Sequence, residues 1–293
     1  MKAVKYAAAK INLLLDVTEK LKNGYHSIFS VMQSIALYDK ITVTKNDAGK
    51  IRLSCSDKSV PTDEKNTAFK AAMLFFDEIH SDDRGIDIEI EKNIPQMAGL
   101  AGGSADAAGV LLALNDLYKT NLSEETLIKL AGRVGADVPF CLKGGLMLAL
   151  DTGLILTPLP RLPEYHLVLV KPNEGVSTAE AYGAIDKKDW IRHPNKELAL
   201  KALVDGDIHE FFSYSANVFE QVIDAGARVE IKSVMRAHNC LYASMTGSGS
   251  AVFGVFMDKK DAEDCFSQLK NSSWQVFLTK PVSKGVLSEG ELE

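Results

Sequence analysis

The sequence has few cysteines and histidines, and their spacing is unlike that of disulfide scaffolds or metal centres. Its four cysteines are far apart with no C-x-x-C pair, and its six histidines show no metal-ligand spacing. We therefore expect reduced thiols, a cytoplasmic protein, and no metal site built from protein ligands.

Long apolar runs and an excess of basic residues are also missing. Lys10, Asn12 and Asp16 interrupt the apolar N-terminus, and Asp137 and Lys143 interrupt the most apolar internal stretch. Neither a signal peptide nor a membrane span is therefore expected. The formal net charge of −6 argues against a nucleic-acid partner, whose binding would need a basic face. A small anionic ligand would need a local pocket instead.

What is present is the composition of an ordinary globular protein. A chain of 293 residues with 46% hydrophobic residues is long enough for two lobes with sizeable cores. Three prolines lie between residues 157 and 163 and interrupt any regular structure there. We therefore predict two lobes, an N-terminal one at 1–157 and a C-terminal one at 164–293.

Hydrophobic periodicity predicts a mixture of helices and strands. The first strands alternate apolar with polar residues, as antiparallel strands do, and a hairpin turn is expected at 47–50. The predicted strands are 11–17, 41–44, 51–55, 86–90, 145–150, 166–170, 241–245, 251–256 and 274–278. The predicted helices are 66–79, 104–118, 123–135, 177–185, 196–204, 207–224, 226–237 and 259–269. In the second lobe this order favours an antiparallel sheet covered on one face.

The stretch 94–118 combines a glycine-rich loop with an apolar helical pattern. Gly99, Gly102 and Gly103 have no Cβ, so the backbone there can turn several N–H groups toward one ligand. From about Ser104 the apolar spacing predicts a buried helix, whose N-terminus would add further donors and a positive dipole end. Ser104 could cap this helix. The stretch therefore predicts a phosphate-binding loop.

A tight turn before a helix would explain the same glycines, so the loop alone leaves both interpretations open. No Lys-Ser or Lys-Thr pair follows the glycines, as it does in a Walker A motif, and there is no G-x-G-x-x-G fingerprint. No protein-kinase catalytic loop or D-F-G motif occurs elsewhere. A phosphate loop here would belong to another family.

Three segments, in this order, resemble the three motifs of the GHMP small-molecule kinases. They are AAAKINLLLDVTEKLKNGYHSI at 7–28, the glycine-rich loop, and TGSGSAVFGVF at 246–256. The first segment, together with GADVPF at 135–140 and GVSTAEAY at 175–182, is most similar to family members that act on 4-diphosphocytidyl-2-C-methyl-D-erythritol. The likeness covers nearly the whole chain.

The resemblance implies both a fold and an activity. The fold would be α+β, with two lobes that each contain a largely antiparallel sheet with helices, and with the active site in the cleft between them. The activity would be ATP-dependent phosphorylation of the 2-hydroxyl of 4-diphosphocytidyl-2-C-methyl-D-erythritol, in non-mevalonate isoprenoid (terpenoid) biosynthesis. ATP would be the phosphoryl donor, and Mg²⁺ is expected because it bridges β- and γ-phosphate oxygens in such transfers.

Two residues are candidates for the chemistry. Phosphoryl transfer needs positioning, charge compensation and an acceptor for the proton of the attacking hydroxyl. By resemblance Asp137 is the candidate base and Lys10 its cationic partner, which would also attract the γ-phosphoryl group. Taken singly, each has an ordinary structural explanation, as a turn aspartate and a solvated strand lysine. Whether Asp137 removes the proton or only orients the hydroxyl stays open.

The resemblance also implies an ATP site. Its residues would be Pro95, Gln96, Met97, Ala98, Gly99, Leu100, Ala101, Gly102, Gly103, Ser104 and Ala105, with Asn66 and Lys92 near the nucleoside. Asp106 is expected to stabilise the helix N-terminus rather than to bind a metal. Met97 stands where the family usually has a small residue, and Ala105 where it usually has a second serine. Because one hydroxyl contact to phosphate would be missing, a modestly raised KM for ATP is predicted.

The expected partner is a small molecule, a cytidine diphosphate derivative. Tyr25 and Tyr182 resemble the family's pair of rings that stack on the base. His26 would read the base edge, and Asn12 would lie near the diphosphate or the reacting hydroxyl. The alternative for Tyr25 and His26 is a hairpin tip with exposed rings.

Two other functions remain open at this point. Another GHMP kinase, acting on mevalonate derivatives, homoserine or a sugar, would not need an aromatic clamp for a pyrimidine. A non-catalytic nucleotide-binding regulator would have no use for a proton acceptor at Asp137. The sequence does not predict the oligomeric state.

Overall fold

The computed structural model describes residues 1–22, 24–224 and 226–292. The first half contains β1 (Lys2–Lys20), β2 (His26–Lys45), β3 (Ile51–Cys55), α1 (Thr67–Glu78), β4 (Ile86–Glu91), α2 (Gly102–Tyr118), α3 (Glu124–Val134), α4 (Val138–Lys143), β5 (Leu146–Asp151) and β6 (Ile155–Pro158). The second half contains β7 (His166–Lys171), α5 (Thr178–Ile185), α6 (Lys196–Val204), α7 (Ile208–Tyr214), η1 (Val218–Gln221), α8 (Ala227–Ala237), β8 (Tyr242–Met245), β9 (Val252–Phe256), α9 (Lys259–Leu269), β10 (Gln275–Thr279), β11 (Val286–Ser288) and η2 (Glu289–Glu291).

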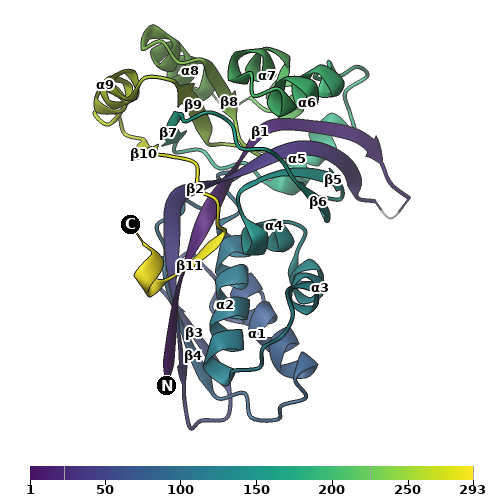
Figure 1. Cartoon of the computed structure of the whole chain (residues 1–293), viewed down its shortest axis with the longest axis vertical. Coiled ribbons are helices and arrows are strands. Elements are labelled where there is room, and N and C mark those ends of the chain that lie inside the picture. The colour runs from purple at the N-terminus through teal and green to yellow at the C-terminus, as the bar shows by residue number, and fades with distance from the viewer. Residues whose placement is uncertain (23, 225, 293) are drawn as a thin grey trace.

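These elements form two sheets with helices, which confirms the predicted α+β class (Figure 1). In the first sheet β11, β1, β2, β4 and β3 are neighbours in that order, and β5 and β6 continue from β2. The second sheet has the order β10, β7, β9, β8 and is antiparallel throughout. The first sheet is largely antiparallel, so the predicted character of both sheets is confirmed.

One expected hairpin in the first sheet is wrong. The turn at 47–50 connects β2 to β3, but these strands do not pair, because β4 lies between them. β3 and β4 are parallel, and a parallel pair needs the long crossover that α1 supplies. The alternation of apolar residues identified β3, nearly all of β4 and only the end of β2, and it could not show which strands would be neighbours.

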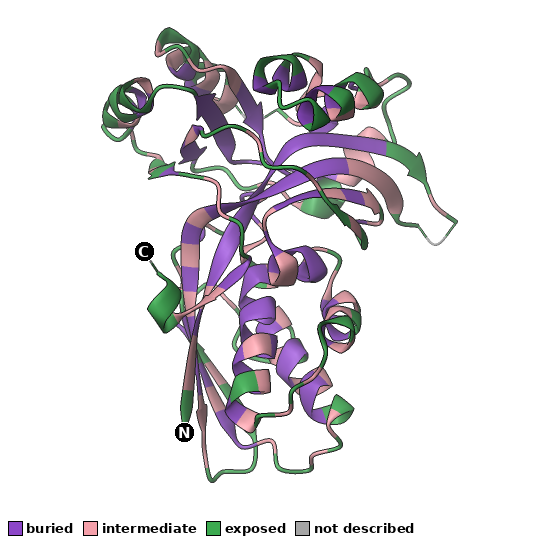
Figure 2. Cartoon of the chain, viewed as in Figure 1, coloured by how far each residue is buried: buried purple, intermediate pink, exposed green. Residues whose placement is uncertain are grey.

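Helix α2 packs against the first sheet at close range. A Cβ added to Gly109 in the middle of this helix would lie 2.9 Å from Cδ1 of Ile41 on β2, so glycine allows the close approach. Nearly every apolar side chain of α2 is buried, and α1 to α4 stand together on one side of the strands (Figures 1 and 2). Because α2 cannot shift without disturbing this core, the loop that precedes it has a rigid support.

Several predicted helix ends are correct, and two regions differ. Asn66 and Ser123 cap α1 and α3 through side-chain hydrogen bonds, so both helices begin one residue after the predicted starts at 66 and 123. The expected helix 207–224 ends at Tyr214, and a short 3₁₀ turn, η1, follows. The expected helix-to-strand corner at Asp137 contains a further helix, α4. A proline in the first turn of α4 is compatible with helix, which explains why Pro139 does not end the structure there.

The two sheets divide the chain near the proline-rich segment, with one exception. The first sheet uses strands up to Pro158, and the second begins at His166. Strand β11, close to the C-terminus, returns to the first sheet and pairs with β1. The lobe boundaries at 157 and 164 therefore stay a proposal, with β11 as the segment that leaves the second lobe. Within the described residues, no helix has the length and apolarity to cross a membrane.

Candidate active site

A cavity of about 360 Å³ opens beside the glycine-rich loop. Its lining includes the whole run 95–104, together with Lys10, Asn12, Asp137 and Tyr182. The structure therefore brings together the predicted phosphate loop, both candidate catalytic residues and two of the candidate substrate residues, from β1, the N-cap of α4 and α5.

The loop enters α2 two residues earlier than predicted. The helix begins at Gly102, after Ala101 in the left-handed region with a φ of 57°, and no side chain caps it. Ser104, the expected cap, lies instead within the first turn, where backbone N–H groups have no partner inside the helix. These donors belong to residues that line the cavity. Together with the positive end of the helix dipole they suit a phosphate group.

The turn after β8 holds the loop in place. Gly99 has a φ of +74°, and a Cβ built there would lie 2.0 Å from the carbonyl oxygen of Thr246, so a side chain cannot fit. The Thr246 hydroxyl donates to the Gly99 carbonyl at 3.2 Å. The Ala251 N–H donates to the Ala98 carbonyl, also at 3.2 Å. The third motif therefore supports the phosphate loop through one threonine hydroxyl and through backbone contacts.

Asn12 connects β1 to the same turn. Its side-chain carbonyl accepts hydrogen bonds from the Gly247 N–H at 2.9 Å and from the Lys10 ammonium at 2.7 Å. Its amide donates to the Ser30 hydroxyl at 2.8 Å, and its N–H donates to the Thr246 hydroxyl at 3.0 Å. Because Asn12 is only 3% exposed, this network orients the Lys10 side chain from behind.

The candidate catalytic pair meets at the cavity. The Lys10 ammonium lies 4.0 Å from Oδ2 of Asp137, and the two side chains are 5% and 39% exposed. Asp137 occupies the N-cap position of α4 but makes no side-chain capping hydrogen bond. Its carboxylate is therefore available to a ligand, with a cation beside it.

Lys92 lines the cavity, but its charge is already paired. Its ammonium donates to Asp39 and, at 2.8 Å, to Asp106, and these three side chains are at most 5% exposed. Burial raises the pKa of Asp106 well above that of a solvated carboxyl group, and Lys92 opposes the shift. Asp39 also accepts the N–H groups of Asn93 and Ile94. The cluster thus fixes the start of the loop to α2. A contact of Lys92 with the nucleoside stays a prediction.

The three remaining candidates for ATP binding lie in different environments: one caps a helix, one lines the cavity and one is buried in the core. Asn66 uses its side chain to accept from Ala68 N–H at 2.8 Å and to donate to the Pro61 carbonyl at 2.7 Å, so its observed role is to cap α1. Met97 lines the cavity and is 60% exposed. Ala105 is fully buried in the core, and the lining run ends one residue before it, at Ser104.

The side chains expected to bind the base lie at the end of the β1–β2 hairpin and on α5. The rings of His26 and Tyr182 stack with centroids 4.7 Å apart, and Tyr182 meets Phe219 edge-on at 5.0 Å. Burial raises the pKa of Tyr182 to about 12, so its phenol is neutral at physiological pH. Tyr25 is 65% exposed, and among the described residues neither it nor His26 lines the cavity.

Asp186 holds this arrangement in place, although no pattern in the sequence pointed to it. Its Oδ1 lies 2.7 Å from Nε2 of His26, and its Oδ2 accepts from the Lys20 ammonium. These hydrogen bonds, first that of Lys20 and then that of His26, lower the pKa of Asp186. One carboxylate at the C-cap of α5 therefore ties both strands of the hairpin to the helix that carries Tyr182.

Two other polar residues at the site were also missed. Asn217 donates to the carbonyl groups of Met245 and Gly247. Thr67 donates to the Gly103 carbonyl at 2.6 Å. Thr246, which belongs to the third motif, is fully buried under the loop. Asn217 and Thr67 have no local signal, because their partners lie far away in the sequence.

Few oxygen ligands for a cation are available among the described residues. Among them, no three His, Cys, Asp or Glu side chains lie close enough to hold a metal ion together. The cavity does contain the Asp137 carboxylate and the Ser104 hydroxyl. Magnesium typically binds one or two protein oxygens plus substrate phosphates and water, so this lining fits an ion that arrives with a nucleotide.

Comparison with protein families gives two matches. Residues 66–145 match the GHMP kinases N terminal domain, and residues 199–275 match the GHMP kinases C terminal domain. Together the two matches span more than half of the chain.

Curated relatives are similar over nearly their full length. The 4-diphosphocytidyl-2-C-methyl-D-erythritol kinase of Clostridium novyi (strain NT) is 42% identical over 94% of this chain and 99% of its own. The enzyme of the same name from Acetivibrio thermocellus is also 42% identical, over 94% of this chain and 98% of its own.

Solved structures agree with these matches. A crystal structure of 4-(cytidine 5'-diphospho)-2C-methyl-D-erythritol kinase superposes with a TM-score of 0.78 at 31% identity, over 96% of this chain and 99% of that one. Homoserine kinase from Cytophaga hutchinsonii superposes with a TM-score of 0.77 at 18% identity, over 98% and 96% of the two chains. The second likeness concerns the fold alone.

Proposed function

The chain belongs to the GHMP kinase family, and we propose from this premise that it phosphorylates the 2-hydroxyl of 4-diphosphocytidyl-2-C-methyl-D-erythritol with ATP. It is an ATP-dependent kinase of small molecules. The proposed reaction is the step in non-mevalonate isoprenoid biosynthesis that the names of its relatives describe. One observation carries the proposal: Lys10, Asp137 and the glycine-rich loop line a single cavity that also reaches Tyr182.

The roles of the residues follow from the chemistry of phosphoryl transfer. The loop amides at 95–104 would hold the ATP phosphates, and Lys10 would neutralise charge that develops on the transferred group. Asp137 would accept the proton of the attacking hydroxyl, or orient that hydroxyl, with Lys10 as its counter-charge. Magnesium, bound to the nucleotide, would bridge the β- and γ-phosphates.

The base end of the site supports the cytidyl substrate. Tyr182 offers a flat ring beside the cavity, and Asp186 holds the neighbouring His26 in a fixed orientation. Stacking is sequence-tolerant, so edge contacts near His26 would have to select cytosine. The role of Asn12 would be to hold the Lys10 ammonium at the reacting end of the substrate, and not only to bind the diphosphate.

We also propose that the protein acts in the cytoplasm, with a small molecule as its partner and without a nucleic acid or a membrane. All four cysteines are free, which suits a reducing compartment. The formal charge of −6 does not suit a polyanionic partner. We further propose that the segments 1–157 and 164–293 act as an ATP-binding and a substrate-binding lobe, apart from β11.

The test is a substrate comparison with purified protein. ADP release is measured with ATP and Mg²⁺, first with the cytidyl substrate, then with mevalonate and with homoserine at equal concentrations. We expect turnover with the first substrate and at least about 100-fold lower kcat/KM with the others, because an unfilled base site loses several kcal/mol of binding. Absence of turnover with the cytidyl substrate, alongside turnover with mevalonate or homoserine, would assign a different GHMP activity.

A further inference from the structure

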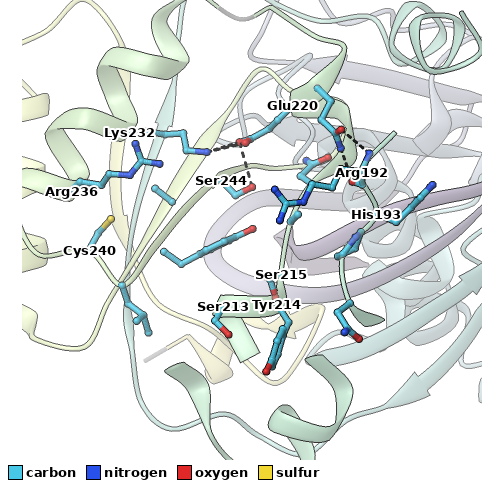
Figure 3. Close-up of a pocket in the computed structure, with 18 of the residues that line it drawn as sticks. Arg192, His193, Ser213, Tyr214, Ser215, Glu220, Lys232, Arg236, Cys240 and Ser244 are labelled. Carbon is cyan, nitrogen blue, oxygen red and sulfur yellow. Dashed lines mark hydrogen bonds and ion pairs between the residues drawn. The ribbon is translucent and has the colours of Figure 1, made fainter. Parts of the chain in front are cut away.

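A second cavity, of about 840 Å³, lies in the C-terminal half of the molecule (Figure 3). It is formed by the loop 190–195 before α6, the segment 213–217 before η1, one face of α8, and strand β8. It shares none of its lining residues with the candidate active site. The two cavities nevertheless touch the same short element, because Phe219 of η1 lines one and Glu220 of η1 lines the other.

The charges around this cavity do not balance. Its lining contains Arg192, Lys232 and Arg236 but a single acidic residue, Glu220, and Lys232 neutralises that residue with contacts of 2.8 and 3.1 Å. The guanidinium groups of Arg192 and Arg236 form no ion pair or hydrogen bond within the described part of the chain. Two uncompensated cations therefore border one cavity in a protein whose formal net charge is −6.

The wall that carries one of these cations is fixed rather than loose. The backbone N–H of Arg192 donates to Oε1 of Gln221 at 2.9 Å, and Nε2 of Gln221 donates to the Arg192 carbonyl at 2.8 Å. Next to it, the His193 ring contacts the buried carboxylate of Asp16 on β1 at 2.7 Å. Because the loop is tied to η1 on one side and to β1 on the other, Arg192 stands over a preformed cavity.

The opposite wall offers further polar groups. Glu220 accepts from the Met245 N–H at 2.7 Å and from the Ser244 hydroxyl at 3.4 Å, and Lys232 lies on the same carboxylate. Figure 3 shows Lys232 and Arg236 side by side on α8, with Arg192 across the cavity from them. An arginine fork binds phosphate oxygens in pairs. Two such forks on facing walls suit a ligand with two anionic centres.

The size and the rim of the cavity indicate an organic ligand rather than a bare ion. The volume of about 840 Å³ is within the range of small-molecule sites. Trp190 lines the cavity and is 69% exposed, so it offers a flat apolar surface at the entrance. We propose that this cavity is a second binding site, separate from the active site, for a small organic diphosphate.

A tryptophan at the cavity allows ligand binding there to be followed by fluorescence. The chain has two tryptophans, Trp190 and Trp274, and only Trp190 lines the cavity. In a Trp274→Phe background, the fluorescence of Trp190 therefore reports on this site and not on the phosphate loop. Pyrophosphate, the simplest diphosphate, is titrated into the full-length chain without Mg²⁺, and the fluorescence signal is compared with calorimetry.

We expect a saturable change in Trp190 fluorescence that fits one site, with the Kd from this signal raised at least tenfold by Arg192→Ala or Arg236→Ala and the signal abolished by both together. Arg52→Ala is the matched control, because its side chain is 61% exposed on a strand of the other lobe. Kinase activity and Tm of the arginine variants should stay close to the wild type, since neither residue lines the active site.

Three results would overturn the proposal: no saturable change in Trp190 fluorescence, equal affinity in the double variant, or an equal loss in Arg52→Ala, which would indicate diffuse charge attraction. None of these results depends on kinase turnover, so the proposal can fail while the proposed function stands.

Discussion

The two ends of the candidate active site are built in different ways. The phosphate end is formed by Lys10, Asn12 and Thr246, which are at most 4% exposed. Hydrogen bonds connect these residues to one another and to the glycine-rich loop, which would bind phosphate through its backbone groups. At the base end, Tyr25 is 65% exposed, and the stack of His26 on Tyr182 depends on one carboxylate beneath it. The first end is preorganised by the core, and the second is assembled from side chains near the surface. Changes at the phosphate end should therefore affect chemistry and fold, whereas changes at the base end should affect substrate affinity.

The largest expected effect is at the phosphate end and concerns the chemical step. Asp137→Asn should lower kcat by roughly 10²- to 10⁴-fold, because the amide cannot accept the hydroxyl proton. The Kd for the substrate should change by less than about threefold. Steady-state kinetics and equilibrium binding measure the two quantities, with Asp47→Asn in an exposed turn as the control. Unchanged kcat in the Asp137 variant would exclude that residue from the mechanism.

The next effect tests whether the loop is held by its neighbour. Gly99→Ala should destabilise the protein by more than about 1 kcal/mol and raise the KM for ATP, because the new Cβ would meet the Thr246 carbonyl at 2.0 Å. Gly49→Ala is the matched control, since Gly49 also has a positive φ of 65° but nothing within 4 Å of the added Cβ. Thermal unfolding and ATP kinetics are measured for both. Equal behaviour of the two variants would mean that backbone strain alone, and not the contact with Thr246, matters.

A smaller effect is expected at the base end. Tyr182→Ala should raise the KM for the cytidyl substrate by roughly five- to 150-fold, the equivalent of about 1 to 3 kcal/mol for one stacked base. The KM for ATP should change little. Tyr182→Phe keeps the ring and should behave like the wild type, because the neutral phenol needs no ionisation. If Tyr182→Ala lowers kcat and leaves the substrate KM unchanged, the two ends are not separate in function.

The smallest effect concerns Ala105, one of two loop positions at which the resemblance implies a departure from the family's usual residue. The resemblance suggests that Ala105 deprives ATP of a hydroxyl contact, but Ala105 is fully buried beyond the end of the cavity lining. Ala105→Ser should therefore leave the KM for ATP within about twofold of the wild-type value, as initial-rate kinetics would show. A clear fall in this KM would mean that the added hydroxyl reaches the phosphates after all.

The parts of the site that sequence could predict are those built from contiguous motifs. The glycine-rich loop, with its small residues before a helical pattern, has a local physical meaning, so residues 94–118 alone made it a candidate phosphate loop, with a tight turn as the alternative. Lys10 and Asp137 were selected only through family resemblance, since each has a common structural explanation by itself. Their 4.0 Å separation depends on how α4 packs beside β1, which no local pattern contains.

What sequence could not predict are contacts between distant segments. Asp186 is an ordinary helix-end aspartate until the fold brings it 2.7 Å from His26, 160 positions earlier in the chain. The same holds for the order β2, β4, β3, because periodicity identifies a strand and its buried face but not its neighbour. Strand β11 has three residues, too few for any periodic signal.

The return of β11 has a consequence for biosynthesis. β1 leaves the ribosome long before its edge partner β11, with which it is in register from Lys5 opposite Ser288 to Ala7 opposite Val286. The lobe that is translated first is therefore finished last, and a message cut short near codon 280 would yield chains with a bare strand edge. Such edges pair with other chains, so truncated products should aggregate rather than accumulate as a folded half-enzyme.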